Sequence, residues 1–131
     1  MIDIDGSYGE GGGQIVRTAL GLSCLYRKPF RIYNIRKGRK KPGLMPQHLT
    51  CVSAARLISG AVVKGDNPGS MELFFSPDTP QAGSYSFDIG TAGSTSLVLQ
   101  TIVPALLFTG ERSSVTLTGG THVPCEPWGQ T

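Results

Sequence analysis

The feature that most constrains this chain is residues 9–17, Gly-Glu-Gly-Gly-Gly-Gln-Ile-Val-Arg. One carboxylate precedes three consecutive glycines, and an amphipathic stretch then begins with an arginine near its start. We interpret the segment as a strand end turning into a helix N-terminus, where backbone N–H groups lack a partner within the helix and can face an anion. Glycine allows positive φ and lets a ligand approach the backbone closely.

Glu10 stands at the front of this turn and could hold a divalent cation, because hard cations take oxygen ligands. The alternative is a glycine-rich turn with a solvated glutamate. The segment is not a Walker A loop, since no Gly-Lys-Ser/Thr follows. It is not a dinucleotide-binding fingerprint either, because Gln14 occupies the position of the last glycine of that motif.

The pattern of apolar residues predicts the order β-α-β-α-β-β for residues 1–80. Ile2 and Ile4 alternate with acidic residues as in a short strand, and Pro46 suits the first position of a helix that ends near Gly60. The expected elements are a strand at 2–5, a helix at 14–26, a strand at 30–35, a helix at 46–59, and strands at 61–65 and 70–76 around a turn at 66–69.

Residues 81–131 are expected to repeat this start at an offset of about 85 residues, after a connector at 77–83. A strand over 85–89, a small-residue turn at 90–94, an apolar helix at 97–108 and a strand at 115–118 form the copy, and residues 121–131 are expected to be a loop. Pro104 should kink the second helix or mark a restart. The predicted class is an α+β fold, an α/β sandwich with one complete unit and the first half of a second.

A second unit that lacks its last helix and two strands leaves an apolar face and a strand edge uncovered. We therefore expect this chain to be a fragment, or to need a partner over that surface, either the rest of a longer chain or another copy. A length of 131 residues fits at most one domain, or a piece of one.

The charge is strongly asymmetric along the chain. No acidic residue lies between Glu10 and Asp66, and this window holds eleven of the twelve basic residues, five of them within 36–41. Such a stretch suits the phosphates of nucleotides or nucleic acids. A solvated basic face that aids solubility is the alternative.

The three cysteines, Cys24, Cys51 and Cys125, are odd in number and have no C-x-x-C spacing. We interpret them as buried thiols in a reducing compartment, with neither a disulfide nor zinc. The start does not resemble a signal peptide, and no run approaches the ~20 apolar residues of a membrane span. We expect a cytoplasmic protein without membrane partners, or a nuclear one in a eukaryote.

Several motifs together resemble the RNA 3′-terminal phosphate cyclase family. Residues 5–7 with 10–17 resemble its opening, and residues 35–39, 42–44 and 46–49 resemble its next block. Residues 91–94, 97–100 and 119–121 match later blocks in the right order. The resemblance covers residues 2–124, whereas the tail after Pro127 departs from it.

The resemblance implies repeated β-α-β-α-β-β units, like those of the C-terminal domain of a bacterial translation initiation factor, with a smaller inserted domain. It also implies ATP and a divalent metal, Mg²⁺ or Mn²⁺. In the family a histidine attacks the α-phosphate to give enzyme-AMP, AMP passes to an RNA 3′-phosphate, and the neighbouring 2′-hydroxyl closes a 2′,3′-cyclic phosphate. That nucleophile lies far beyond residue 131, so the chain alone is expected to be inactive, and neither His48 nor His122 is the nucleophile.

By the same resemblance, Glu10 binds the metal, Arg17 and Arg39 hold phosphates with Arg36 beside them, and Gln47 is an active-site glutamine. Arginine suits phosphate because its planar fork bonds two oxygens. The remaining candidates are Gly11, Gly12 and Gly13 for phosphate, Gln100 near the nucleotide, and Pro127 beside the adenine. The alternatives are a solvated Arg17, a Gln47 that only starts a helix, a Gln100 that is a buried structural amide, a structural His48 and a loop His122.

Two other functions compete with an ATP-dependent RNA-end cyclase. One is a non-catalytic RNA-binding relative, like the cyclase-like factor of ribosome biogenesis. The other is an enolpyruvyl transferase, which resembles the family in its repeated units but lacks the Glu-Gly-Gly-Gly-Gln block. The joint presence of Glu10, Arg17, Arg39 and Gln47 favours the enzyme, since a binding module would not need this set together.

Overall fold

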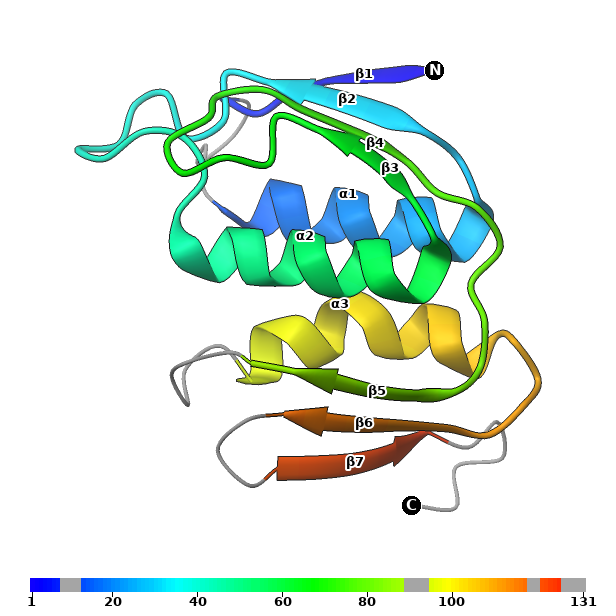
Figure 1. Ribbon diagram of the computed structural model, residues 1–131. Coiled ribbons are helices and arrows are strands. Elements are labelled where there is room, and N and C mark those ends of the chain that lie inside the picture. The colour runs from blue at the N-terminus through cyan, green and yellow to red at the C-terminus, as the bar shows by residue number, and fades with distance from the viewer. Residues whose placement is uncertain (8–12, 89–94, 118–120, 126–131) are drawn as a thin grey trace.

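The computed structural model describes residues 1–7, 13–88, 95–117 and 121–125 (Figure 1). Within these residues the fold has four layers, a sheet, a pair of helices, a third helix and a second sheet. The elements in chain order are β1 (Ile2–Asp5), α1 (Gly13–Tyr26), β2 (Phe30–Tyr33), α2 (Pro46–Ser59), β3 (Val62–Lys64), β4 (Leu73–Ser76), β5 (Ser84–Phe87), α3 (Thr95–Leu107), β6 (Ser113–Leu117) and β7 (Thr121–Cys125).

The first sheet has the strand order β1-β2-β4-β3. β1 and β2 are parallel, with Ile4 opposite Ile32, because α1 carries the chain back between them. β4 pairs antiparallel with both β2 and β3. The predicted β-α-β-α-β-β order is therefore confirmed.

The second sheet has the order β5-β6-β7, with β5 and β6 parallel and β6 and β7 antiparallel. The strand, helix and strand predicted for the second copy are confirmed, and the α+β sandwich with them. The expectation of a loop is wrong for residues 121–125, which form β7. Its Pro124 lies opposite Ser114 in the register, and an edge strand tolerates the missing N–H of proline.

Pro104 neither ends nor restarts α3, which runs from Thr95 through Leu107. Of the kink or restart expected at Pro104, the restart is wrong, because a proline near the end of a helix removes a single backbone donor while the packing of the apolar face holds the remaining turns. The kink stays a prediction. Val98, Ile102 and Leu106 of that face are buried.

One hydrophobic core joins both halves of the chain. Leu20 of α1, Phe75 of β4 and Ile102 of α3 are all fully buried in the same cluster. Helices α1 and α3 come close at Gly21, where a β-carbon would lie 3.3 Å from the carbonyl oxygen of Thr101. The three helices run side by side with their N-terminal ends at the same end of the molecule (Figure 1).

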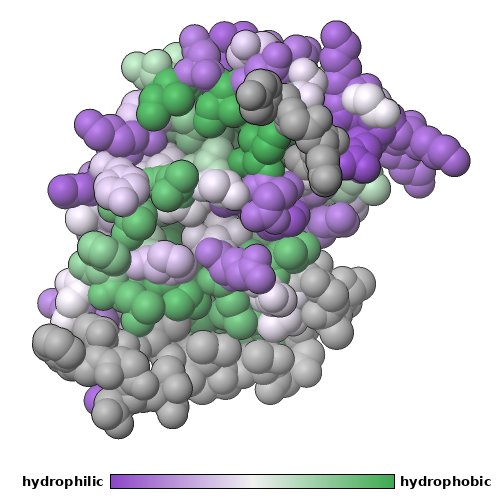
Figure 2. All heavy atoms as spheres, turned by 180° about the vertical axis from the view of Figure 1, so that it is seen from behind, coloured by the Kyte–Doolittle hydropathy of each residue, from purple (hydrophilic) through white to green (hydrophobic). Residues whose placement is uncertain are grey.

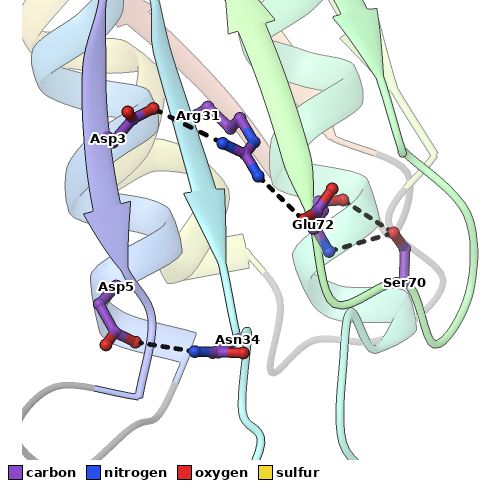
Figure 3. A network of polar contacts seen from close by, with 6 residues as sticks. All are labelled: Asp3, Asp5, Arg31, Asn34, Ser70 and Glu72. Atoms are coloured by element: carbon purple, nitrogen blue, oxygen red, sulfur yellow. Dashed lines mark hydrogen bonds and ion pairs between the residues drawn. The ribbon is translucent and has the colours of Figure 1, made fainter.

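The outer face of the first sheet carries a network of polar contacts (Figure 3). Arg31 of β2 lies 3.9 Å from Asp3 of β1 and 3.0 Å from Glu72, which precedes β4. At the end of β1, the Ser7 hydroxyl and N–H donate to the Asp5 carboxylate at 2.6 and 2.9 Å and lower its pKa. These contacts fix the strand end that leads into residues 8–12.

Seen from behind, the molecule exposes apolar side chains on part of its surface (Figure 2). A groove of about 420 Å³ follows β1 and α1, and its lining includes Ile2, Ile4, Leu22 and Tyr26. In the part of the chain that is described, no helix is both long enough and apolar enough to span a bilayer.

Candidate anion-binding site

The N-terminal ends of α1 and α2 meet at Gly13 and His48. A β-carbon on Gly13 would lie 2.1 Å from His48 Nε2 and 2.7 Å from His48 Cδ2, so only glycine fits beneath the imidazole ring. Gly13 begins α1, and His48 is the third residue of α2. The contact therefore brings two helix starts together, and the positive end of each helix dipole favours negative charge there.

Arg17 lies one turn into α1 at this meeting point. Its Nη2 donates to Gln14 Oε1 at 2.9 Å, and its Nη1 would be 3.1 Å from a β-carbon on Gly13. Its Nε is buried and has no hydrogen-bond partner among the described groups. A buried donor of this kind is costly unless an acceptor meets it, so the site is suited to an anion that supplies one.

Arg36 brings a second positive charge to the same region. The residue has a positive φ of 51°, which turns the chain at the start of residues 36–43, the basic loop. Its Nη1 donates to the carbonyl oxygens of Lys41 at 2.5 Å and Gly43 at 3.0 Å. Part of its donor capacity therefore holds the loop, while its charge still acts on His48.

His48 is buried and electrically neutral at pH 7. Burial, together with the nearby charges of Arg36 and Arg17, lowers its pKa to about 4. Its Nδ1 accepts a hydrogen bond from the backbone N–H of Met45 at 2.9 Å, which caps the start of α2. In the neutral ring the proton must then reside on Nε2, the nitrogen that faces Gly13.

The other described candidates are more exposed. Arg39 is exposed in the basic loop, and its backbone N–H donates to the carbonyl oxygen of Arg36 at 3.0 Å. Gln47 is exposed in the first turn of α2, beside His48. Gln100 is exposed on α3 and donates to Ser96 Oγ at 3.2 Å, so the alternative of a buried amide is wrong.

The remaining candidates, Glu10, Gly11, Gly12 and Pro127, lie outside the described residues, as does the side chain of His122. Among the described residues no three His, Cys, Asp or Glu side chains gather as a metal-binding group. Cys24 and Cys51 are free and buried, as expected. Burial raises the pKa of both thiols, that of Cys24 to about 11, so both are protonated at neutral pH.

Sequence reasoning did not connect Gly13 with His48. The available signals were three consecutive glycines and a histidine at the third position of a helix that begins with proline. Each is local, and only the packing of α1 beside α2 shows that the ring occupies the place where a side chain on residue 13 would be.

Comparison with known proteins gives the family. The family model described as RNA 3′-terminal phosphate cyclase matches residues 8–130. A protein of that name from Sulfolobus acidocaldarius is 61% identical over 128 residues, which are 97% of this chain and 38% of the relative. The RNA 3′-terminal phosphate cyclase of Staphylothermus marinus is 59% identical, and the match covers 97% of this chain and 36% of the relative.

A bacterial relative is almost as similar. The RNA 3′-terminal phosphate cyclase of Ralstonia nicotianae is 57% identical over 96% of this chain and 36% of its own length. The chain thus spans a little over a third of the length of these curated relatives. With a family match over nearly its whole length, this chain belongs to the RNA 3′-terminal phosphate cyclase family.

Proposed function

We propose that this chain carries the ATP-phosphate site of an enzyme that converts an RNA 3′-terminal phosphate into a 2′,3′-cyclic phosphate. The observation that carries the proposal is Arg17. Its guanidinium lies where two helix N-termini meet, and its buried Nε has no acceptor among the described groups. A nucleotide phosphate offers that acceptor, together with negative charge for the helix ends.

The arginines act by meeting charge that develops on phosphoryl oxygens. Arg17 and Arg39 bind the phosphates, and Arg36 adds its charge while it holds the loop. Each charged hydrogen bond contributes about 1.5–3 kcal/mol, and donors that are already placed need no reorganisation during the reaction. Gln47 and the glycine backbone of 11–13 complete the phosphate side, whereas Gln100 and Pro127 serve the nucleoside side.

The divalent cation, Mg²⁺ or Mn²⁺, is assigned to Glu10 on the chemistry of its carboxylate. Gly13, Arg17 and His48, which meet here, are cationic or neutral and therefore suit the phosphates of a nucleotide. They offer no carboxylate for a metal ion, whereas Glu10 lies next to them in sequence. When bound, the cation would neutralise negative charge on the phosphates.

The covalent step is assigned to a histidine outside these 131 residues. His48 is a poor nucleophile because it is buried, its Nδ1 is occupied by the Met45 N–H, and its Nε2 carries the proton. We therefore infer that the chain by itself forms no covalent adduct with AMP. In the complete enzyme, which we place in the cytoplasm, AMP is transferred to RNA 3′ ends and the 2′,3′-cyclic phosphate is then formed. The rest of that enzyme, or another copy, covers the incomplete second unit.

The test is adenylation with labelled ATP in the complete enzyme that contains this chain. Arg17→Ala should reduce label incorporation at least tenfold, since it removes one or more charged hydrogen bonds. Lys28→Ala is the control, because Lys28 is exposed beyond the opposite end of α1. Normal labelling of Arg17→Ala would refute the proposed role, and a wild-type enzyme that binds RNA but takes no label would identify a non-catalytic relative.

A further inference from the structure

The His48 ring occupies the place of a side chain on Gly13. The distances of 2.1 Å and 2.7 Å from a β-carbon at position 13 to Nε2 and Cδ2 show that the ring lies directly against the backbone of the first residue of α1. His48 is 3% exposed, so its ring fills this space rather than bordering it. The imidazole ring therefore lies between the two helix starts, with its Nε2–Cδ2 edge against Gly13.

One hydrogen bond fixes the ring from the other side. Its Nδ1 is held by the Met45 N–H at 2.9 Å, which anchors it to the start of α2. The same Gly13 β-carbon position lies 3.1 Å from Arg17 Nη1, so the ring and the guanidinium flank one point of the α1 backbone. Any movement of α1 toward α2 would shift Arg17 and the first N–H groups of α1 together.

From this geometry we propose that His48 is a positioning residue, a spacer whose ring sets the first turn of α1, and with it Arg17, against the first turn of α2. The proposal rests on the proposed function, because what is positioned is the phosphate site. His48 makes no contact with the reacting atoms in this role. It acts through Gly13 and Arg17.

His48→Gln separates spacing from helix capping. A glutamine at the third helical position can still accept the N-cap N–H, as in a capping box, but it cannot replace the ring. We expect ATP affinity, measured by calorimetry on the complete enzyme, to fall at least tenfold, and the NMR signal of Arg17 Nε–H to shift. If His48 only capped α2, the variant would keep both wild-type values, which would overturn the proposal.

A double-mutant cycle tests the contact itself. Gly13→Ala should weaken ATP binding strongly in the wild type, because its β-carbon meets the ring, but should add little in a His48→Ala background. Additive effects would overturn the proposal. Leu22→Ala, a half-exposed position on α1, should leave the affinity unchanged. Circular dichroism checks that each variant folds.

The outcomes distinguish the two proposals. A wild-type enzyme that does not bind ATP contradicts the proposed function, whereas binding that is insensitive to His48→Gln contradicts only the positioning role. Nitrogen NMR of the imidazole gives a further result that does not depend on ATP. The proton is expected on Nε2 at pH 7, and a proton on Nδ1 would contradict the geometry from which the spacer role is inferred.

Discussion

Arg17 and Arg31 show that basic residues in one acid-free window have different surroundings. Arg31 is paired with Asp3 and Glu72, and its guanidinium lies 5.7 Å from the centre of the Tyr33 ring. Arg17 has a neutral partner, Gln14, and a buried Nε that none of the described groups meets. The charge of Arg31 is thus balanced by carboxylates on the outer face of the first sheet. The charge of Arg17 lies at the starts of α1 and α2 without a carboxylate partner among the described residues.

Arg39 is the residue at which loss of function should be cleanest. Its side chain is exposed, and its backbone N–H, which alanine retains, donates to the Arg36 carbonyl oxygen. We expect Arg39→Ala to abolish adenylation in the complete enzyme while the free energy of unfolding stays within about 0.5 kcal/mol of the wild type. Label incorporation and chemical denaturation are the two measurements, and near-normal labelling would refute the role.

His48 should make stability depend on pH. Its pKa is about 4 in the folded protein and 6.5 ordinarily, so between these values the unfolded chain binds a proton that the folded one does not. The free energy of unfolding should therefore be highest above pH 6.5 and fall as the pH drops toward 4, by on the order of 3 kcal/mol. Urea denaturation at several pH values measures this dependence.

The matched variant for this measurement is His48→Gln, which removes the titrating group. Other groups, such as the Asp5 carboxyl with its lowered pKa, contribute at the acid end and are unchanged in the variant. The difference between the wild type and His48→Gln in how the free energy of unfolding varies with pH is therefore due to the His48 imidazole. A difference that does not vary between pH 4 and 6.5 would show that the imidazole is not buried as described.

At the scale of elements, the basic loop is docked onto the turn before β4. The Ile35 N–H donates to the Met71 carbonyl at 3.0 Å, and Leu44 exchanges backbone hydrogen bonds with Ser70 and Gly69 at 2.9 and 2.8 Å. Gly43 lies at this junction with a φ of 84°, and a β-carbon there would be 2.2 Å from the Gly69 carbonyl oxygen. The loop that carries Arg39 is therefore fixed at its base.

Gly43→Ala should loosen this junction. The substitution combines a left-handed backbone with a clash against main-chain atoms, and we expect it to cost more than about 2 kcal/mol and to lower ATP affinity. Gly60→Ala is the control, because Gly60 has a φ of 65° at the end of α2 but open space around its β-carbon position. It should cost about 1 kcal/mol and leave ATP affinity unchanged. An equal loss in the free energy of unfolding for Gly43→Ala and Gly60→Ala would contradict the close packing of the loop against the turn before β4.

At the scale of the whole molecule, the two sheets share one core through the three helices. Residues 1–80 and 81–131 as separate units remain a prediction from the sequence repeat. A shared core has a different consequence, because neither sheet can lose its helices without exposing apolar surface of the other half. We infer that the described parts of the chain unfold together.

Leu106→Ala tests this inference. Leu106 of α3 is fully buried, and its truncation should lower the free energy of unfolding by about 2–5 kcal/mol in a single transition. Amide hydrogen exchange should show the same loss of protection in β2 of the first sheet as in β6 of the second. Leu107→Ala, at a neighbouring position that is 36% exposed, should cost clearly less. Loss of protection in the second sheet alone would contradict a common unfolding unit.

The sequence alone determined the family and the elements from β1 to β6 with their order, but not β7. Alternating and helical spacing depend on which face of each element is apolar, and that property is local. The strands around Ile4 and Ile32 and the helices beginning at Gly13 and Pro46 follow from it. The loop assigned to residues 121–125 was wrong because a proline-containing edge strand is stabilised by its partner, here β6, rather than by its own residues.

Only the tertiary structure decided how the candidate residues are arranged and which groups they contact. It placed the His48 ring on Gly13, turned the Arg36 fork toward Lys41 and Gly43, and left Arg17 Nε without a described partner. These contacts join residues on different elements or across a loop. They depend on how closely α1 and α2 pack and on the loop path, and neither leaves a periodic signal in the sequence.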